Sequence, residues 1–101
     1  MVGEIKWTVQ ALEDIENIAN YIAKDSFQYA SIQTKCFFEQ VRIPEAQPNV
    51  GRIVPELNSK TIRQLTEGRY RIFYRIVSRK RIDILTVHHS SRLLSNNPLF
   101  K

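Results

Sequence analysis

The segment RYRIFYRIV, residues 69–77, alternates in the way that a β-strand requires. Successive side chains of a strand point to opposite faces of the sheet, so every second residue shares a face. One face would carry large apolar and aromatic side chains, Tyr70, Ile72, Tyr74 and Ile76. The other would carry Arg69, Arg71, Phe73, Arg75 and Val77. The pattern predicts a strand whose first face meets the core and whose second face presents three guanidinium groups around one aromatic ring.

The arginine-bearing face has two interpretations. Guanidinium groups around a ring can bind phosphates while a base or an apolar side chain stacks on the ring. The target-binding residues would then be Arg63, Arg69, Arg71, Phe73 and Arg75. Alternatively, the face is solvated and its arginines pair with Glu56, Glu67 and Asp83. Residues 52–101 hold eleven Lys/Arg and only these three acids, so the acids cannot neutralise the bases, and the count favours binding.

Two further β-rich runs flank this strand, at residues 61–66 and 81–88. They are separated from it by Glu67-Gly68 and by Ser78-Arg79-Lys80, each short enough for a hairpin turn. The three runs predict an antiparallel meander. Residues 4–8 are also compatible with a short strand.

The first half of the chain has the helical period. Apolar residues recur at helical spacing across residues 9–25, at Ala11, Leu12, Ile15, Ile18, Ala19 and Ile22. A second helix is predicted after the capping sequence DSFQ, which begins at Asp25. Pro44 and Pro48 should end it or kink it near Arg42, because proline lacks a backbone donor and clashes within a helix. We therefore expect one α+β domain over residues 1–101, in the order β-α-α-β-β-β, with an antiparallel sheet on a helical hairpin.

Charge divides between the two halves of the chain. Residues 1–51 hold four Lys/Arg and seven Asp/Glu, a net −3, whereas residues 52–101 sum to +8. Such a concentrated field attracts anionic partners, either nucleic acid or an acidic protein segment. With one cysteine, Cys36, and no metal-ligand spacing, we expect no disulfide, metal or cofactor. No apolar stretch has the length of a signal peptide or a membrane span, so we expect a cytoplasmic protein with no membrane partner.

Four motifs occur in a fixed order: IKW…A…DI…IA.YI, P.VGRIVPEL, YRIFYRI and IDILTVHHSSR. In this order the chain resembles the RelE/ParE superfamily, the toxins of bacterial type II toxin-antitoxin pairs, from about Ile5 to Arg92. The resemblance implies an antitoxin whose C-terminal segment wraps around the toxin. It also implies one of two targets, because RelE-like members cleave mRNA in the ribosome and ParE-like members poison DNA gyrase.

A ribonuclease of this superfamily needs a proton donor, a proton acceptor and cations over the phosphate. The resemblance places candidates for these catalytic roles at Arg71, Arg75, His89 and Arg92. His88 shares strand parity with Ile82, so we expect it to cap the core, which leaves His89 as the candidate for proton transfer. Whether the chain is an enzyme depends on which target applies.

The sequence departs from RelE in two places. The segment ELNSKTIRQL has only Lys60 and Arg63 where RelE carries several lysines, and no tyrosine follows Tyr74. These departures favour gyrase inhibition over mRNA cleavage. A non-toxic basic module that binds nucleic acid is a third possibility. The last apolar residues, in LLSNNPLF at 93–100, either dock over the sheet or fray, and we expect docking.

Overall fold

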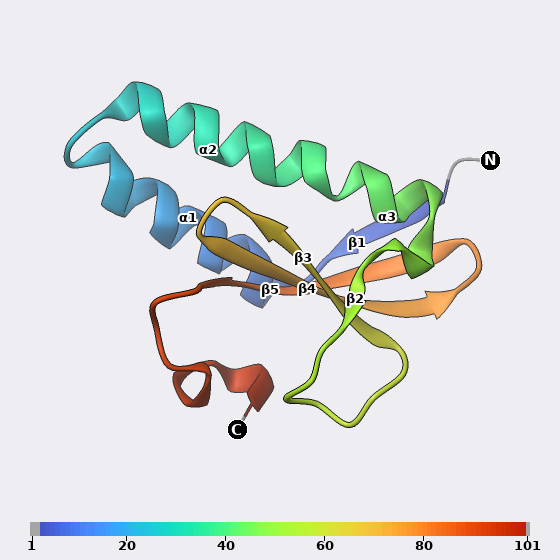
Figure 1. The fold of residues 1–101 in the computed structure, drawn as a ribbon. Coiled ribbons are helices and arrows are strands. Elements are labelled where there is room, and N and C mark those ends of the chain that lie inside the picture. Colours follow the sequence, from blue (N-terminus) through green and yellow to red (C-terminus); the bar gives the residue numbers. More distant parts are fainter. Residues whose placement is uncertain (1–2, 101) are drawn as a thin grey trace.

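The computed structural model describes residues 3–100. Figure 1 shows two long helices above a twisted sheet, with the C-terminal segment below it. The five strands are β1 (Glu4–Trp7), β2 (Arg52–Ile53), β3 (Ile62–Glu67), β4 (Tyr70–Ser78) and β5 (Arg81–His89). Strands β3, β4 and β5 form the predicted meander.

The sheet is mixed, in the order β1-β5-β4-β3-β2. All of its pairs are antiparallel except β1 with β5, which is parallel, with Ile5 opposite Ile82. The expectation of a purely antiparallel sheet is therefore wrong at its N-terminal edge, and the two-residue β2 was not expected. Thr8 follows β1, and its hydroxyl shares one proton between the carbonyls of Ile84 at 2.7 Å and Leu85 at 3.0 Å. The same hydroxyl oxygen caps the next helix by accepting from the Ala11 amide.

The helices are α1 (Val9–Ala23), α2 (Phe27–Gln40) and the short α3 (Arg42–Ala46). Ser26, not Asp25, caps α2, by accepting from the Tyr29 backbone amide. Helix α2 ends before Val41, and Pro44 lies in the first turn of α3, where a backbone N–H would have no partner within the helix. The predicted break near Arg42 is confirmed.

The main core lies between the sheet and the helices. Ile72 and Tyr74 of β4 are fully buried there with Ile82 and Ile84 of β5, and Tyr70 and Ile76 pack at its margin. The predicted apolar face of the arginine-rich strand is therefore confirmed. The Tyr74 hydroxyl also donates to the Pro48 carbonyl at 2.6 Å and accepts from the Gly51 amide at 2.9 Å.

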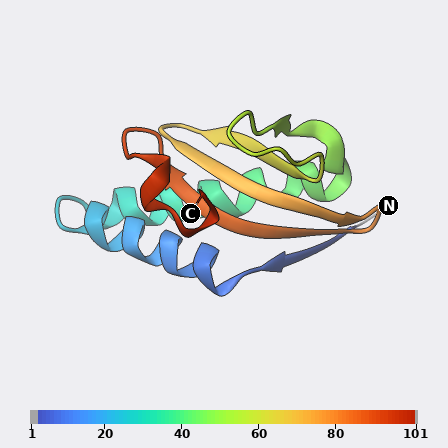
Figure 2. The ribbon, with the colours of Figure 1, turned by 90° about the horizontal axis from the view of Figure 1, so that it is seen from below.

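A second, smaller core lies on the opposite face of the sheet. Phe73 is fully buried there with Val54 and Ile62, and the tail covers the cluster with Leu94, Leu99 and Phe100. The rings of Phe73 and Phe100 meet edge to face, 5.2 Å apart between centroids. Figure 2 shows this C-terminal segment in front of the strands. The tail docks as expected, and for this reason the Phe73 ring is not exposed for stacking, so that part of the predicted target-binding face is wrong.

No helix within residues 3–100 is long and apolar enough to cross a membrane. No group of three His, Cys, Asp or Glu side chains in this range could hold a metal ion.

Candidate functional site

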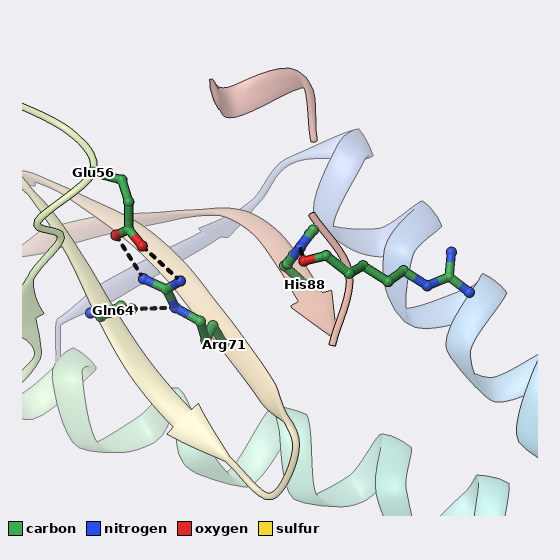
Figure 3. A network of polar contacts seen from close by, with 5 residues as sticks. Glu56, Gln64, Arg71 and His88 are labelled. Carbon is green, nitrogen blue, oxygen red and sulfur yellow. Dashed lines mark hydrogen bonds and ion pairs between the residues drawn. The ribbon is translucent and has the colours of Figure 1, made fainter. Parts of the chain in front are cut away.

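Arg71 is held within the molecule. Its Nη atoms donate to both oxygens of Glu56, at 3.0 and 3.2 Å, and its Nε donates to Gln64 Oε1 at 2.6 Å. Its guanidinium carbon lies 4.9 Å from the centroid of the Phe73 ring, and only 19% of the side chain is exposed. Figure 3 shows the guanidinium enclosed by Glu56 and Gln64. Arg71 is thus a neutralised cation that ties β4 to the segment before β3.

The ion pair with Arg71 also changes the pKa of Glu56. The hydrogen bond from Arg71 lowers the pKa of the Glu56 carboxyl, against a smaller opposing effect of burial. The pairing of an arginine on this face with Glu56 was one of the two interpretations of the strand, and for Arg71 it is the correct one. The other two acids bind elsewhere, Asp83 to Arg81 and Glu67 to amides of α2.

Arg63 is also a structural residue in this geometry. Its Nη1 donates to the carbonyl oxygens of Asn49 and Gly51, at 3.1 and 3.0 Å. These bonds hold the segment that also binds the Tyr74 hydroxyl. Arg63 was predicted to bind the target, but its Nη1 already binds backbone carbonyls of the protein itself.

Arg69, Arg75 and Arg92 are exposed and form no ion pair within residues 3–100. Arg69 lies in the two-residue turn between β3 and β4, after Gly68, whose φ of +58° favours glycine. Arg75 lies farther along β4, opposite Asp83 of β5. Of the predicted cations, these three have guanidinium groups accessible to a partner.

A bulge in β5 decides where the two histidines point. Phe73 pairs with Thr86 whereas Tyr74 pairs with Ile84, so Leu85 is an extra residue in the ladder. Beyond the bulge the parity is inverted, and His88 lies opposite Arg71 on the tail side of the sheet. The expectation that His88 shares a face with Ile82 is wrong, although His88 is buried, with 7% of its surface exposed.

His88 belongs to a buried hydrogen-bond network that holds the tail. Asn97 Oδ1 accepts from the Leu99 amide, so its Nδ2 is the group that faces Thr86 Oγ1 at 3.0 Å and His88 Nδ1 at 3.2 Å. His88 Nδ1 is therefore an acceptor, and its Nε2–H donates to the Arg92 carbonyl at 3.0 Å. The Thr86 hydroxyl in turn donates to Asp14 of α1.

His89 lies on the helix side of the sheet. Its ring meets that of Tyr70 edge to face, with 5.1 Å between centroids. Its Nδ1 accepts from the backbone amide of Ser91 at 3.1 Å, which places the proton of the neutral ring on Nε2. With Nδ1 accepting from the Ser91 amide, His89 presents an N–H donor at Nε2 and no open acceptor nitrogen, so the fold does not present it as a general base.

The four candidate ribonuclease residues do not converge. His89 and Arg92 line a cleft of about 580 Å³ between α1, the adjoining ends of β4 and β5, and the tail, together with Arg69 and Tyr70. Arg71 and Arg75 are not among the residues that line this cleft. Arg71 points to the other face, toward Glu56, as Figure 3 shows.

Comparison with known proteins agrees with this fold. The family model of the ParE toxin of the type II toxin-antitoxin system parDE matches residues 5–94. The chain belongs to the ParE toxin family. No curated protein sequence matches it significantly.

Two solved structures resemble this ParE toxin. The chromosomal ParDE toxin-antitoxin system from P. aeruginosa aligns with a TM-score of 0.70 and 25% identity, over 87% of this chain and 96% of that one. The toxin-antitoxin complex RelBE2 from Mycobacterium tuberculosis aligns with a TM-score of 0.56 and 20% identity, over 88% of this chain and 99% of that one. The latter supports the fold alone.

Several residues that shape the site of this ParE toxin were not predicted as site residues. Gln64 was missed because an amide on a strand has no distinctive pattern, and Asp14 because it lies among other polar residues of α1. Asn97 was missed because its partners are eleven and nine residues away. Of the residues that shape the site, only Glu56 could be recognised from the sequence, because it is one of just three acids in the basic half, residues 52–101.

Proposed function

We propose that this ParE toxin inhibits DNA gyrase and does not cleave RNA. Family membership establishes the class of toxin, and the target is the step that we add. The main support is that the ribonuclease candidates lie on two faces of the sheet. Arg71 is neutralised by Glu56 on one face, and His89 accepts a backbone hydrogen bond on the other. Cleavage of RNA needs these groups around one phosphate.

Inhibition by surface contact makes smaller demands on the site. It needs accessible side chains that can bind another protein or its DNA, and Arg69, Arg75 and Arg92 are exposed in this way. Interface energy concentrates in a few residues, and arginine is frequent among them. Gyrase acts in the cytoplasm of bacteria, so the proposal places the toxin there.

A cognate antitoxin is part of the proposal. The similar structure from P. aeruginosa is that of a toxin-antitoxin system, and the alignment with this toxin covers 96% of the matched chain in that structure. Residues 52–101 sum to +8, so we expect an antitoxin whose C-terminal region combines acidic and apolar residues. A basic antitoxin, or one that binds only the acidic first half, would contradict the electrostatic part of this proposal.

Expression in bacteria without the antitoxin tests the target in the cell. Gyrase inhibition should produce DNA breaks and filamentous cells while transcripts persist. Rapid cleavage of transcripts would instead identify a ribonuclease. Normal growth of cells that contain folded protein would contradict toxicity and favour the non-toxic nucleic-acid-binding module.

A further inference from the structure

The cleft beside α1 shares Arg69 and Arg92 with the surface proposed to contact gyrase, and it has further features that a surface contact does not need. It occupies about 580 Å³, within the roughly 300–1,000 Å³ typical of small-molecule sites. Its lining includes apolar side chains, such as Ile18 and Val87, and polar groups from α1, from β4 and β5 and from the tail. It is therefore a concave site whose walls come from segments far apart in the sequence.

The acidic group of this cleft is already satisfied. Asp14 Oδ1 accepts from Gln10 Nε2 at 2.8 Å, and Oδ2 accepts from the Val87 amide at 3.0 Å and from the Thr86 hydroxyl. Asp14 is the only carboxylate among the lining residues that the structure describes. Its oxygens face protein donors, so the cleft has little acceptor capacity to offer a cation.

Free hydrogen-bond donors, in contrast, are abundant. Arg69 and Arg92 line the cleft and form no ion pair within residues 3–100. His89, held through Nδ1 by Ser91, has its Nε2–H available. Burial raises the pKa of the Tyr70 phenol while the charges of Arg69 and Arg92 lower it, so both guanidinium groups act on the same hydroxyl. Two guanidinium cations and an imidazole N–H donor suit an oxyanion.

The mouth of the cleft also carries an exposed ring. Tyr21 of α1 is 66% exposed, and the ammonium of Lys24 lies 5.8 Å from its centroid. An exposed ring near cations is a surface on which a nucleobase can stack. The amide side chains of Asn17 and Asn96 are also among the lining residues and can bond the edge of a base.

We propose that this cleft binds a nucleoside phosphate, with its phosphate at Arg69 and Arg92 and its base on Tyr21. An acidic peptide would satisfy the two arginines equally. The nucleoside phosphate is favoured because the cleft has the volume of a small-molecule site and adds a ring and amides beside the cations. The site shares Arg69 with the residues predicted for the arginine-bearing face, whereas Arg71 and Arg75 do not line it, and its occupancy does not depend on gyrase.

Calorimetric titration of the whole protein tests the site, with AMP, adenosine, inorganic phosphate and a short glutamate-rich peptide as probes. AMP should bind with a Kd below about 1 mM, and adenosine and phosphate at least about tenfold more weakly. Arg69→Gln and Arg92→Gln should each weaken AMP binding about tenfold. Arg79→Gln is the matched control, an exposed arginine at the far end of the β4–β5 hairpin, and should change nothing.

Tyr21→Ala should weaken AMP binding about fivefold and leave phosphate binding unchanged. Tyr29→Ala is its control, because Tyr29 is equally exposed, at 68%, and lies outside the cleft. Absence of saturable AMP binding up to about 10 mM would overturn the proposal. So would equal effects of Arg69→Gln and Arg79→Gln, or tighter binding of the peptide than of AMP. Since the assay contains no gyrase, these outcomes leave the proposed target untouched.

Discussion

The Arg71 guanidinium and the Glu56 carboxylate form a two-bond ion pair, with N–O distances of 3.0 and 3.2 Å. This pair joins the start of β4 to the segment that precedes β3, and it lies over the buried Phe73 ring. An arginine in this arrangement stabilises the fold, and its charge is not free to hold a phosphate. The same residue would be the leading catalytic cation if the protein were a ribonuclease.

Arg71→Ala should lower the free energy of unfolding by about 1–3 kcal/mol, because it removes charged hydrogen bonds and uncovers Phe73. Arg75→Ala is the matched control, since Arg75 is exposed on the same strand, and its effect should stay within about 0.5 kcal/mol. Urea unfolding of the three proteins measures both. Equal stability of the two variants would show that the Glu56 pair contributes nothing.

Tyr74→Phe should destabilise the protein by about 1–3 kcal/mol, because the hydroxyl bonds both the Pro48 carbonyl and the Gly51 amide in a buried place. Gly51 tolerates no bulk there, since an added Cβ would lie 2.7 Å from the Tyr74 ring and 2.9 Å from the Gln64 carbonyl. Thermal unfolding near neutral pH measures the loss. An unchanged melting temperature would contradict the account of this contact.

The same tyrosine predicts sensitivity to alkali. Burial raises the pKa of Tyr74 above its ordinary value of 10.0, against lowering effects of Gly51 and Arg63. The folded state then holds this proton more tightly than the unfolded state, so the stability from this group is present below about pH 10 and is lost as pH rises through the folded pKa. Between about pH 8 and pH 11, Tyr74→Phe should lose less free energy of unfolding than the unmodified protein. Equal losses would contradict the prediction.

Asn97→Ala should release the C-terminal tail. The buried amide bonds Thr86, His88 and the Leu99 backbone, so its loss leaves several polar groups unpaired and should cost about 1–3 kcal/mol. Asn96→Ala, at an exposed neighbour, is the control. Limited proteolysis followed by mass spectrometry should detect faster cleavage after residue 92 in Asn97→Ala alone. Equal cleavage of the two variants would show that the network does not hold the tail.

Much of the fold could be predicted because local signals and burial agree. The alternation of residues 69–77 identified the face of β4 that meets the helices, and Pro44 marked the break after α2. The parallel pairing of β1 could not be predicted, since it joins residues 4–7 to residues 81–84 at the other end of the chain, where no local signal gives the strand direction.

The candidate site was harder to predict, because one extra residue changes it. Strict alternation along β5 places His88 with Ile82, but the bulge at Leu85 inverts the faces and sends His88 to the tail and His89 to Tyr70. Likewise, alternation correctly placed Phe73 away from the helices, but it could not show that the tail covers that ring. Parity gives the face of a residue, and only the tertiary fold gives its exposure.

A supercoiling assay with purified gyrase, relaxed plasmid and this toxin, with no RNA or ribosomes present, tests directly whether the toxin inhibits gyrase. We predict that the toxin blocks supercoiling. His89→Gln should weaken the free energy of toxin binding to gyrase by no more than about 2 kcal/mol, the range of one ordinary interface residue. Ribosome-dependent cleavage of mRNA is measured in parallel with the same preparation. Uninhibited supercoiling together with mRNA cleavage that His89→Gln reduces by about 10² or more would contradict the claim.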